Sequence, residues 1–271
     1  MRNAIHDIWP NAVSRTLPDK LALRVRHIPG YCIICGRLTI FDISSENLRE
    51  DVICKNCGSF NRQRQLSMAL FSCIQGRALS FWANIRSIPK NTLIWNVEAN
   101  GALHKMLSQH FGRNLVSSEY VDSSLKSGEI KDGILHVNMQ ETHFKENSLD
   151  VILSSDVLEH MPWPEKALEE TLRILKPGGF HVFTVPFYGH RFTNEKRAGM
   201  DGEGRIDHLL SEIYHGDPVR PSEGVLVYNI FAPELLCDLE RIGFRVRWCR
   251  IYSPLHGVLG NNGIVIIAQK Q

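Results

Sequence analysis

The sequence lacks the two glycine-rich motifs that hold most nucleotide cofactors. The turn after the first expected strand of the main domain, residues 96–102, has no G-x-G-x-x-G pattern, and no G-x-x-x-x-G-K-[ST] occurs in the chain. The first motif lets the backbone approach a pyrophosphate, and the second surrounds phosphates with backbone N–H groups. Nicotinamide dinucleotides and P-loop nucleotides are therefore disfavoured as ligands.

Long apolar runs and a strong net charge are also missing. The longest uncharged stretch, residues 251–269, is broken by Pro254 and by several glycines and asparagines. It does not supply the roughly 20 mostly apolar residues that cross a bilayer. Residues 1–11 have no apolar signal-peptide core, so we expect a cytoplasmic protein without a membrane partner. The net charge of +2 is too small to indicate a nucleic-acid binder, and 43% hydrophobic residues predict a globular fold.

Four of the seven cysteines form two C-x2-C pairs. Cys32 and Cys35 are separated by eighteen residues from Cys54 and Cys57. This spacing is typical of a zinc site with four thiolate ligands. Disulfides are disfavoured in a reducing cytosol, and neither pair lies in the βαβ context of a redox C-x2-C. We therefore predict a structural zinc ion bound by these four residues.

The composition along the chain predicts several segments. They are an N-terminal extension (1–29), a zinc ribbon (30–62), a linking helical segment (63–90) and a main domain (91–271) with a substrate insert at 187–228. The helix of the linking segment is expected from about Leu66 to Ile85. Arg62 and Arg64 follow the second cysteine pair; they are expected on a solvated helix face, with phosphate contact as the alternative.

The main domain alternates short apolar runs with amphipathic segments. Strands are expected at 92–97, 114–120, 134–137, 149–154, 180–185, 244–252 and 263–268, with helices at 101–110, 163–175 and 233–242. This alternation predicts an α/β fold with a doubly wound, mostly parallel sheet. The short connection between the last two strands allows the final strand to pair antiparallel. Ligands of such sheets bind beyond the carboxyl ends of the strands, where the strand order reverses.

Glu119 ends the second expected strand, about twenty residues after the first turn. An acid at this place can accept hydrogen bonds from ribose hydroxyls. A solvated surface glutamate is the alternative.

Residues 149–186 read LDVILSSDVLEHMPWPEKALEETLRILKPGGFHVFTVP. This segment resembles the fourth and fifth strands of class I S-adenosylmethionine-dependent methyltransferases. Together with residues 118–120 (SEY), residues 214–218 (YHGDP) and the two C-x2-C pairs, it resembles a group of zinc-ribbon methyltransferases, some associated with sugar and polysaccharide biosynthesis. The resemblance covers about residues 30–270. It implies a seven-stranded sheet with the last strand inserted antiparallel, and an S-adenosylmethionine cleft over the first two strands.

The same resemblance implies a set of cofactor residues. Glu98, Asn100 and Gly101 would line the methionine end, Glu119 the ribose, Asn138 and Met139 the adenine, and Ser154 and Ser155 the sulfonium. Two features depart from the family pattern: Asn96 replaces the usual acid of the first strand, and Glu98-Ala99-Asn100-Gly101 replaces a Gly-x-Gly loop. Fewer glycines limit close backbone approach to the cofactor.

Methyl transfer needs an acceptor held near the methyl group and, for a hydroxyl or amine, a base. The candidate catalytic residues are Asp156, His160, His215 and Asp217. His160 has a structural alternative, the turn into the next helix. His215 and Asp217 can form a base with its orienting carboxylate, or shape a turn fixed by Gly216 and Pro218. The insert also carries basic residues suited to an anionic substrate, or to a solvated surface: His190, Arg191, Arg197, Arg205 and His208.

We therefore predict an S-adenosylmethionine-dependent methyltransferase that acts on an oxygen or nitrogen of a small-molecule or saccharide intermediate. Two alternatives stay open. One is an RNA methyltransferase whose ribbon recognises the substrate, with a salt-dependent affinity for RNA. The other is a catalytically degenerate protein that binds the cofactor for regulation and turns over no acceptor.

Overall fold

The computed structural model describes residues 17–75, 82–216, 222–260 and 263–271. A helix, α2 (Leu17–Val25), precedes a small antiparallel sheet in the order β1-β2-β3. Its strands are β1 (His27–Cys32), β2 (Arg37–Asp42) and β3 (Ile53–Cys54), and the 3-10 turn η1 (Leu48–Glu50) lies between β2 and β3. β1 ends at Cys32 and β3 ends at Cys54, so the two strands that flank β2 each carry one cysteine of a C-x2-C pair.

A six-stranded sheet forms the centre of the molecule, in the order β16-β17-β9-β8-β4-β5. Its strands are β4 (Ile94–Asn96), β5 (Leu115–Ser117), β8 (Leu149–Ser155), β9 (Leu175–Thr184), β16 (Phe244–Arg250) and β17 (Ile264–Lys270). β5, β4, β8 and β9 are parallel, and β17 is antiparallel to both of its neighbours. The predicted doubly wound, mostly parallel sheet with an antiparallel last strand is confirmed. Because β5 lies on one side of β4 and β8 on the other, the strand order reverses at β4.

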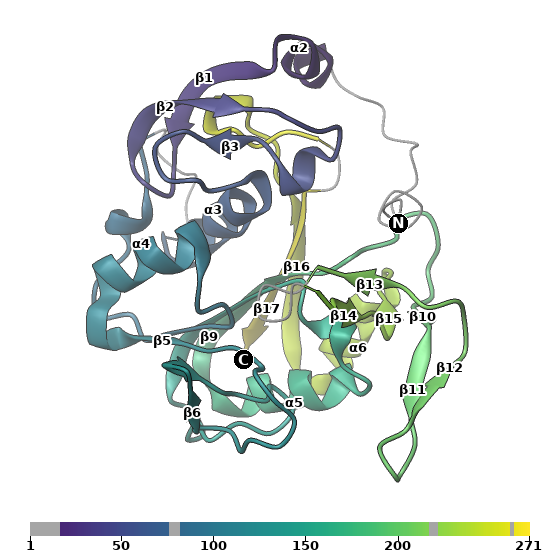
Figure 1. Cartoon of the computed structure of the whole chain (residues 1–271). Helices are drawn as coiled ribbons and strands as arrows, with labels where there is room; N and C mark the ends of the chain where they lie inside the picture. The colour runs from purple at the N-terminus through teal and green to yellow at the C-terminus, as the bar shows by residue number, and fades with distance from the viewer. Residues whose placement is uncertain (1–16, 76–81, 217–221, 261–262) are drawn as a thin grey trace.

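Helices cover both faces of this sheet (Figure 1). They are α3 (Asn61–Gln75), α4 (Gly101–Phe111), α5 (Pro164–Ile174) and α6 (Glu234–Ile242). Side chains of a strand alternate between faces. Val151 and Leu153 of β8 accordingly join the hydrophobic cluster of α3 and α4, whereas Ile152 joins the cluster of α5 and α6. The short apolar runs of the sequence thus reflect strands that are buried on both faces.

The strand expected at 134–137 is wrong as a full member of the central sheet. Ile134–Leu135 (β7) pairs instead with Ile130–Lys131 (β6) in a local hairpin. The next residue, His136, joins the end of β5 through a single parallel bridge to Glu119. The backbone of His136 also bonds residues 128 and 129, so the hairpin takes up the hydrogen-bonding groups that a longer pairing would need. The central sheet of the described residues consequently has six strands, not the seven that the resemblance implied.

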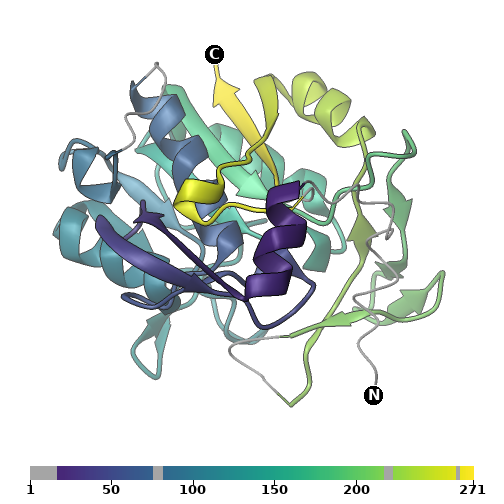
Figure 2. The ribbon, with the colours of Figure 1, turned by 90° about the horizontal axis from the view of Figure 1, so that it is seen from above.

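The linking helix begins at Asn61, five residues before its expected start, and ends within the described residues at Gln75. Residues 76–81 of its expected span lie outside the described residues. α3 packs against β8, β9 and β17, and its core residues share one cluster with those of the small sheet. It is therefore a layer of the main fold as well as its connection to the small sheet (Figure 2). The domain boundaries given above stay a prediction.

The insert forms three small antiparallel pairs on the side of the molecule away from α4 (Figures 1 and 2). They are β10 (Glu195–Lys196) with β15 (Asn229–Ile230), β11 (Ala198–Met200) with β12 (Ile206–His208), and β13 (Tyr214–His215) with β14 (Val225–Leu226). Within the described residues, no helix has the length and apolar character needed to span a membrane.

Candidate functional site

The four cysteines of the two pairs come together. Their sulfurs all lie within 4.8 Å of one another, and Cys32 Sγ is 3.8 Å from Cys57 Sγ. A tetrahedral zinc ion with Zn–S bonds of about 2.3 Å holds its sulfurs about 3.8 Å apart. Cys32, Cys35 and Cys54 are buried, and all four thiols are free of disulfides. The cluster therefore fits the predicted zinc ion in ligand type, number and spacing.

Arg64 lies fully buried beside this cluster, not on a solvated face as expected. Its guanidinium donates to the backbone oxygens of Ser59, Val52 and Gly257, and it stacks over the Phe41 ring at 4.5 Å. Burial lowers the pKa of Arg64 to about 10, and the neighbouring thiols counteract this shift. A four-thiolate zinc centre carries a net negative charge, so a buried cation here compensates it.

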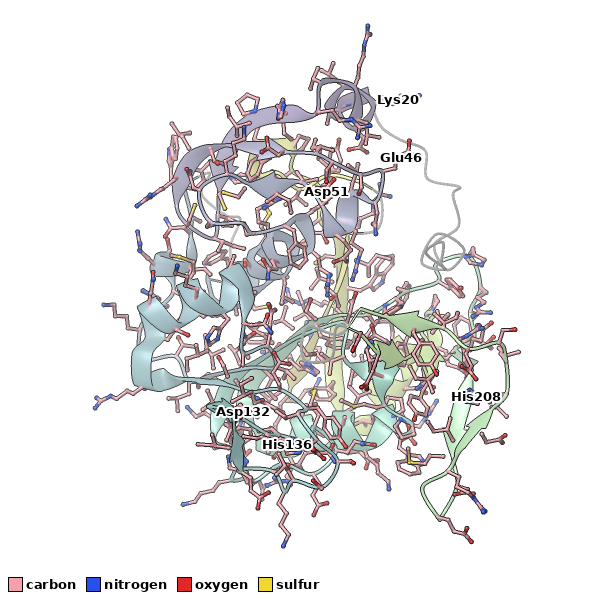
Figure 3. All side chains as sticks on the ribbon, viewed as in Figure 1. Lys20, Glu46, Asp51, Asp132, His136 and His208 are labelled. Carbon is pink, nitrogen blue, oxygen red and sulfur yellow. The ribbon has the colours of Figure 1, made fainter. Side chains whose placement is uncertain are left out.

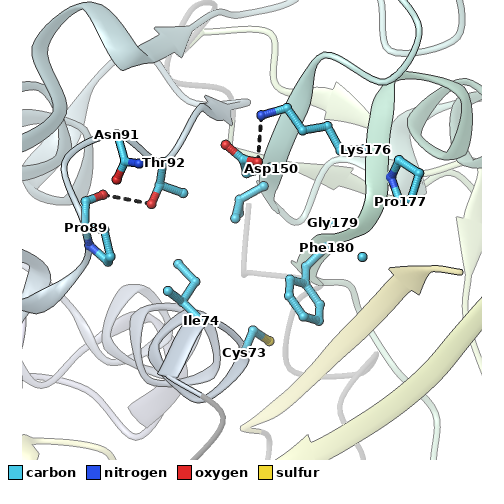
Figure 4. Close-up of a pocket in the computed structure, with 12 residues that line it drawn as sticks. Cys73, Ile74, Pro89, Asn91, Thr92, Asp150, Lys176, Pro177, Gly179 and Phe180 are labelled. Atoms are coloured by element: carbon cyan, nitrogen blue, oxygen red, sulfur yellow. Dashed lines mark hydrogen bonds and ion pairs between the residues drawn. The ribbon is translucent and has the colours of Figure 1, made fainter.

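An open depression of about 440 Å³ lies at the opposite edge of the sheet from the expected ligand site (Figure 4). The amino ends of β8 and β9 line it, including Asp150 and Lys176, whose carboxylate and ammonium are 2.8 Å apart. Doubly wound sheets bind ligands at the carboxyl ends of their strands. This depression is therefore not the candidate cofactor site.

At the carboxyl end of β4, the altered loop is held by its own side chains. Asn96 is buried and donates its amide to the backbone oxygen of Glu98 at 2.6 Å. Gly101 begins α4 with a φ of +77°, and a Cβ there would lie 2.8 Å from Glu98 Oε1. This positive φ favours glycine here. One glycine thus serves the tight turn, and Asn96 supplies the hydrogen bond that fixes the loop.

Glu119 extends from the end of β5 toward this loop. Its Oε1 accepts from the backbone N–H of Ala99 at 2.8 Å and from the amide of Asn100 at 3.2 Å. The predicted residues Glu98, Asn100, Gly101 and Glu119 therefore lie together at the point where the strand order reverses.

Glu98 is the titratable group with an unusual pKa in this loop. Burial raises the pKa of its carboxyl to about 7, although Arg62 acts in the opposite direction. Gln63 of α3 donates to Glu98 Oε1 at 3.2 Å. Near neutral pH, Glu98 can therefore exist in both protonation states, and a cationic ligand would favour the ionised one.

Asp156, at the end of β8, is held by two arginines of the N-terminal part. Arg49 makes a bidentate ion pair to both of its oxygens at 2.6 Å, and Arg62 lies 3.3 Å away. Thr184 donates to the same carboxylate at 2.9 Å. Burial alone would raise the pKa of Asp156, but the arginine charges outweigh it and hold this pKa below its ordinary value. Asp156 thereby connects the small sheet to the carboxyl edge of the central sheet.

The other residues predicted to bind the cofactor are buried or half-buried. Met139 is a buried core residue, and Asn138 accepts from the backbone N–H of Gln140. Ser154 is 2% exposed, and its hydroxyl is 2.9 Å from Nε2 of His181 inside the protein. Ser155 accepts a hydrogen bond from Arg62 at 2.7 Å. The side chains of Met139 and Ser154 are therefore buried inside the protein.

His160 and His215 meet beside this edge, although 55 positions separate them. His215 Nδ1 lies 3.3 Å from His160 Nε2, and each of these two nitrogens lies 3.7 Å from Oε1 of the fully buried Glu159. Burial raises the pKa of Glu159 well above its ordinary value and lowers that of His215. Asp217, the predicted partner of His215, lies outside the described residues.

The arginines of the insert are matched by acids of the insert itself. Arg191 and Arg197 both pair with Glu195, and Arg205 pairs with Asp201 and Glu203. His208 lies 3.4 Å from Glu212, and His190 contacts the Tyr188 ring. This matching leaves little excess positive charge for an anionic substrate.

Sequence reasoning missed three residues of this edge: Arg49, Gln63 and Glu159. Arg49 lies in η1, 107 positions from its partner Asp156, and no local pattern indicates that contact. Glu159 belongs to the quoted turn at residues 158–160, whose histidine alone was singled out. A completely buried glutamate is unusual and would indicate a candidate functional residue, but its burial is known only once the chain is folded.

Parts of this chain are similar in sequence to known proteins. Residues 99–183 match the model of the methyltransferase domain family. An uncharacterised methyltransferase of Mycobacterium marinum is 32% identical over 117 residues, or 41% of this chain and 44% of that protein. One of Mycobacterium tuberculosis is 34% identical over 96 residues, 34% of this chain and 36% of that protein. The chain thus spans less than half the length of these curated relatives.

Among solved structures, an S-adenosylmethionine-dependent methyltransferase from Mesorhizobium loti has a TM-score of 0.42 at 16% identity, covering 68% of this chain and 94% of that one. The 1,6-didemethyltoxoflavin-N1-methyltransferase of Burkholderia thailandensis has a TM-score of 0.42 at 16% identity, covering 78% of each chain.

The strand order and the matched residues define the class of the central domain. It has a Rossmann-like methyltransferase fold with a mostly parallel sheet. Residues 99–183 of this domain therefore match the methyltransferase domain family, and the domain is joined to a small N-terminal sheet with a four-cysteine cluster.

Proposed function

We propose that this protein transfers the methyl group of S-adenosylmethionine to an oxygen or nitrogen of a small-molecule or saccharide intermediate. The observation that carries the proposal is the placement of Glu119 against the loop after β4, where its Oε1 lies 2.8 Å from the Ala99 N–H. The matched family segment begins in that loop, at residue 99. In this fold class, an acid after the second strand binds the ribose hydroxyls.

Methyl transfer itself is an in-line displacement. The acceptor atom bonds the methyl carbon, the S–C electron pair moves to sulfur, and a hydroxyl or amine acceptor loses its proton. Asp156 is engaged by Arg49, Arg62 and Thr184, which supports a positioning role for it. His160 and His215 are then the groups we assign to the acceptor side, because their imidazoles meet beside the end of β8.

Replacement of Glu119 by alanine should abolish micromolar binding of S-adenosylmethionine and S-adenosylhomocysteine. Hydrogen bonds to a charged group contribute about 1.5–3 kcal/mol, so even one lost ribose bond weakens binding by at least about ten-fold. Isothermal titration calorimetry on zinc-quantified protein measures this directly. Glu146→Ala, at an exposed glutamate of the same domain, is the matched control and should bind like the wild type.

Equal affinity of the Glu119→Ala and wild-type proteins would contradict the assigned cofactor site. Binding of S-adenosylmethionine without its conversion to S-adenosylhomocysteine in the presence of any offered oxygen or nitrogen acceptor would instead favour the degenerate, regulatory alternative.

Cofactor affinity should rise about ten-fold between pH 6 and pH 8. With a pKa of about 7, the ionised fraction of Glu98 grows about ten-fold over this range, and the cationic cofactor prefers the ionised form. In the absence of cofactor, the ionisation of Glu98 has the opposite effect: it lowers the stability of the folded protein. Because the folded pKa lies above the unfolded one, the stability that Glu98 contributes is complete below about 4.5 and is lost as the pH rises through about 7.

Calorimetric dissociation constants at four pH values test this dependence. The Glu98→Gln variant is the control, because it retains every titration of the cofactor itself and removes only that of Glu98. A pH profile unchanged by Glu98→Gln would show that another group is responsible.

A further inference from the structure

We propose that Glu159, His160 and His215 form a second metal site, which binds a divalent transition cation. One oxygen and two nitrogens of these side chains lie within 4.8 Å of one another. The three separations are 3.3 Å between the imidazole nitrogens and 3.7 Å from each imidazole to Glu159 Oε1. Tetrahedral ligands at about 2.0–2.1 Å from zinc lie about 3.3–3.4 Å apart. The donors are thus already close to the spacing of a bound cation.

Glu159 supplies the strongest independent argument. Its side chain is 0% exposed, and among the described residues neither carboxylate oxygen has a hydrogen-bond partner. Burying a carboxylate without a donor or a cation is energetically costly. A cation between Glu159 Oε1 and the two imidazoles would compensate its charge.

The orientation of His160 also suits a metal ligand. Its Nδ1 lies 2.7 Å from the carbonyl oxygen of Leu226, an acceptor only, so Nδ1 carries the proton and Nε2 presents its lone pair to the cluster. Metal-binding histidines commonly donate their other N–H to a backbone carbonyl in this way. Leu226 is on β14, the strand paired with β13, which carries His215. The insert therefore provides one ligand and the support of another.

The ligand set defines the cation class. Two imidazoles and one carboxylate favour first-row transition cations such as Zn²⁺, Co²⁺ or Fe²⁺, whereas Mg²⁺ and Ca²⁺ prefer oxygen ligands. Both imidazoles are partly accessible, 13% for His160 and 18% for His215, so a further ligand can approach the cation at a position on that side. Binding of an acceptor hydroxyl at this position rests on the proposed function, but binding of the cation does not.

Cobalt titration of the full chain, with zinc in the cysteine cluster, tests the site. We expect one saturable Co²⁺ equivalent per wild-type chain, without the intense sulfur-to-cobalt absorption that thiolate ligands give. Loss of a group that only hydrogen-bonds to a metal ligand already costs about 10–100-fold in metal affinity, so loss of the ligand in His215→Ala should weaken Co²⁺ binding by at least ten-fold. Glu159→Gln should weaken it too, because it removes the anionic ligand while keeping the side-chain volume.

His208→Ala is the matched control, since His208 belongs to the same insert but lies on β12 outside the cluster (Figure 3). It should bind Co²⁺ like the wild type. One zinc per chain and an unchanged melting temperature without Co²⁺ identify variants that fold. The proposal is overturned if the wild type binds no saturable Co²⁺ beyond the cysteine cluster, or if His215→Ala binds it equally well. Neither result depends on cofactor binding or turnover.

Discussion

A Cys54→Ser variant should lose the metal of the cysteine cluster and fail to form the N-terminal sheet. Structural zinc contributes about 10–16 kcal/mol in small zinc-finger peptides, as much as the whole stability of an ordinary domain. The sheet has only three short strands, so its own core cannot replace the metal. Because α3 shares its hydrophobic cluster with this sheet, the loss should extend to the main fold.

Metal analysis and thermal unfolding measure this effect. The wild type should contain one zinc per cysteine cluster, and Cys54→Ser should contain none there and unfold at a far lower temperature. Cys237→Ser is the matched control, because Cys237 is an exposed cysteine on α6, outside the cluster. A Cys54→Ser protein with full zinc content and wild-type melting would contradict the four-thiolate site.

An Asp156→Asn variant should be destabilised by about 3 kcal/mol and should lose most cofactor-dependent activity. Breaking one side of a buried ion pair typically costs about 3–5 kcal/mol, since the partner charge stays buried. Here two guanidinium groups would be left without the Asp156 carboxylate, those of Arg49 and Arg62, which are 6% and 14% exposed. Activity should fall because Asp156 fixes the end of β8, next to the proposed sulfonium position.

Urea unfolding measures the free energy of unfolding of Asp156→Asn, with Asp122→Asn as the control. Asp122 makes a 2.8 Å ion pair with Lys131 on the surface, where solvent screens the charges, so its variant should unfold like the wild type. A double-mutant cycle between Arg49 and Asp156 then separates their pairing from other effects. Wild-type stability of Asp156→Asn would show that this ion pair contributes nothing to the fold.

The cysteine cluster holds the small sheet together, and the Asp156 ion pairs join this sheet to the candidate site. η1 lies between two strands of that sheet and carries Arg49, which binds the end of β8. α3 carries Gln63 to Glu98 of the cofactor loop. Removing the zinc should therefore disturb cofactor binding even though the cysteines lie in a separate cluster.

The sequence by itself determined the features that are encoded locally. Each C-x2-C pair needs only a tight turn to present two sulfurs, so its spacing predicted the cluster. Alternating apolar runs predicted α5 and most of the parallel sheet, although β9 begins at Leu175, five residues before the expected strand start at 180. Glu119 was proposed as a ribose ligand because its distance along the chain from the first turn is characteristic of this fold class.

The tertiary structure alone decided the features that depend on distant partners. Arg62 and Arg64 were expected on a solvated helix face, yet Arg64 is buried and Arg62 is only 14% exposed, because Asp156 and the backbone of Gly257 reach them from far along the chain. The third expected strand was lost to a local hairpin whose pairing competes with the sheet edge. Glu159, His160 and His215 meet only because the insert folds back over the end of β8. Short-range patterns carry no information about such encounters.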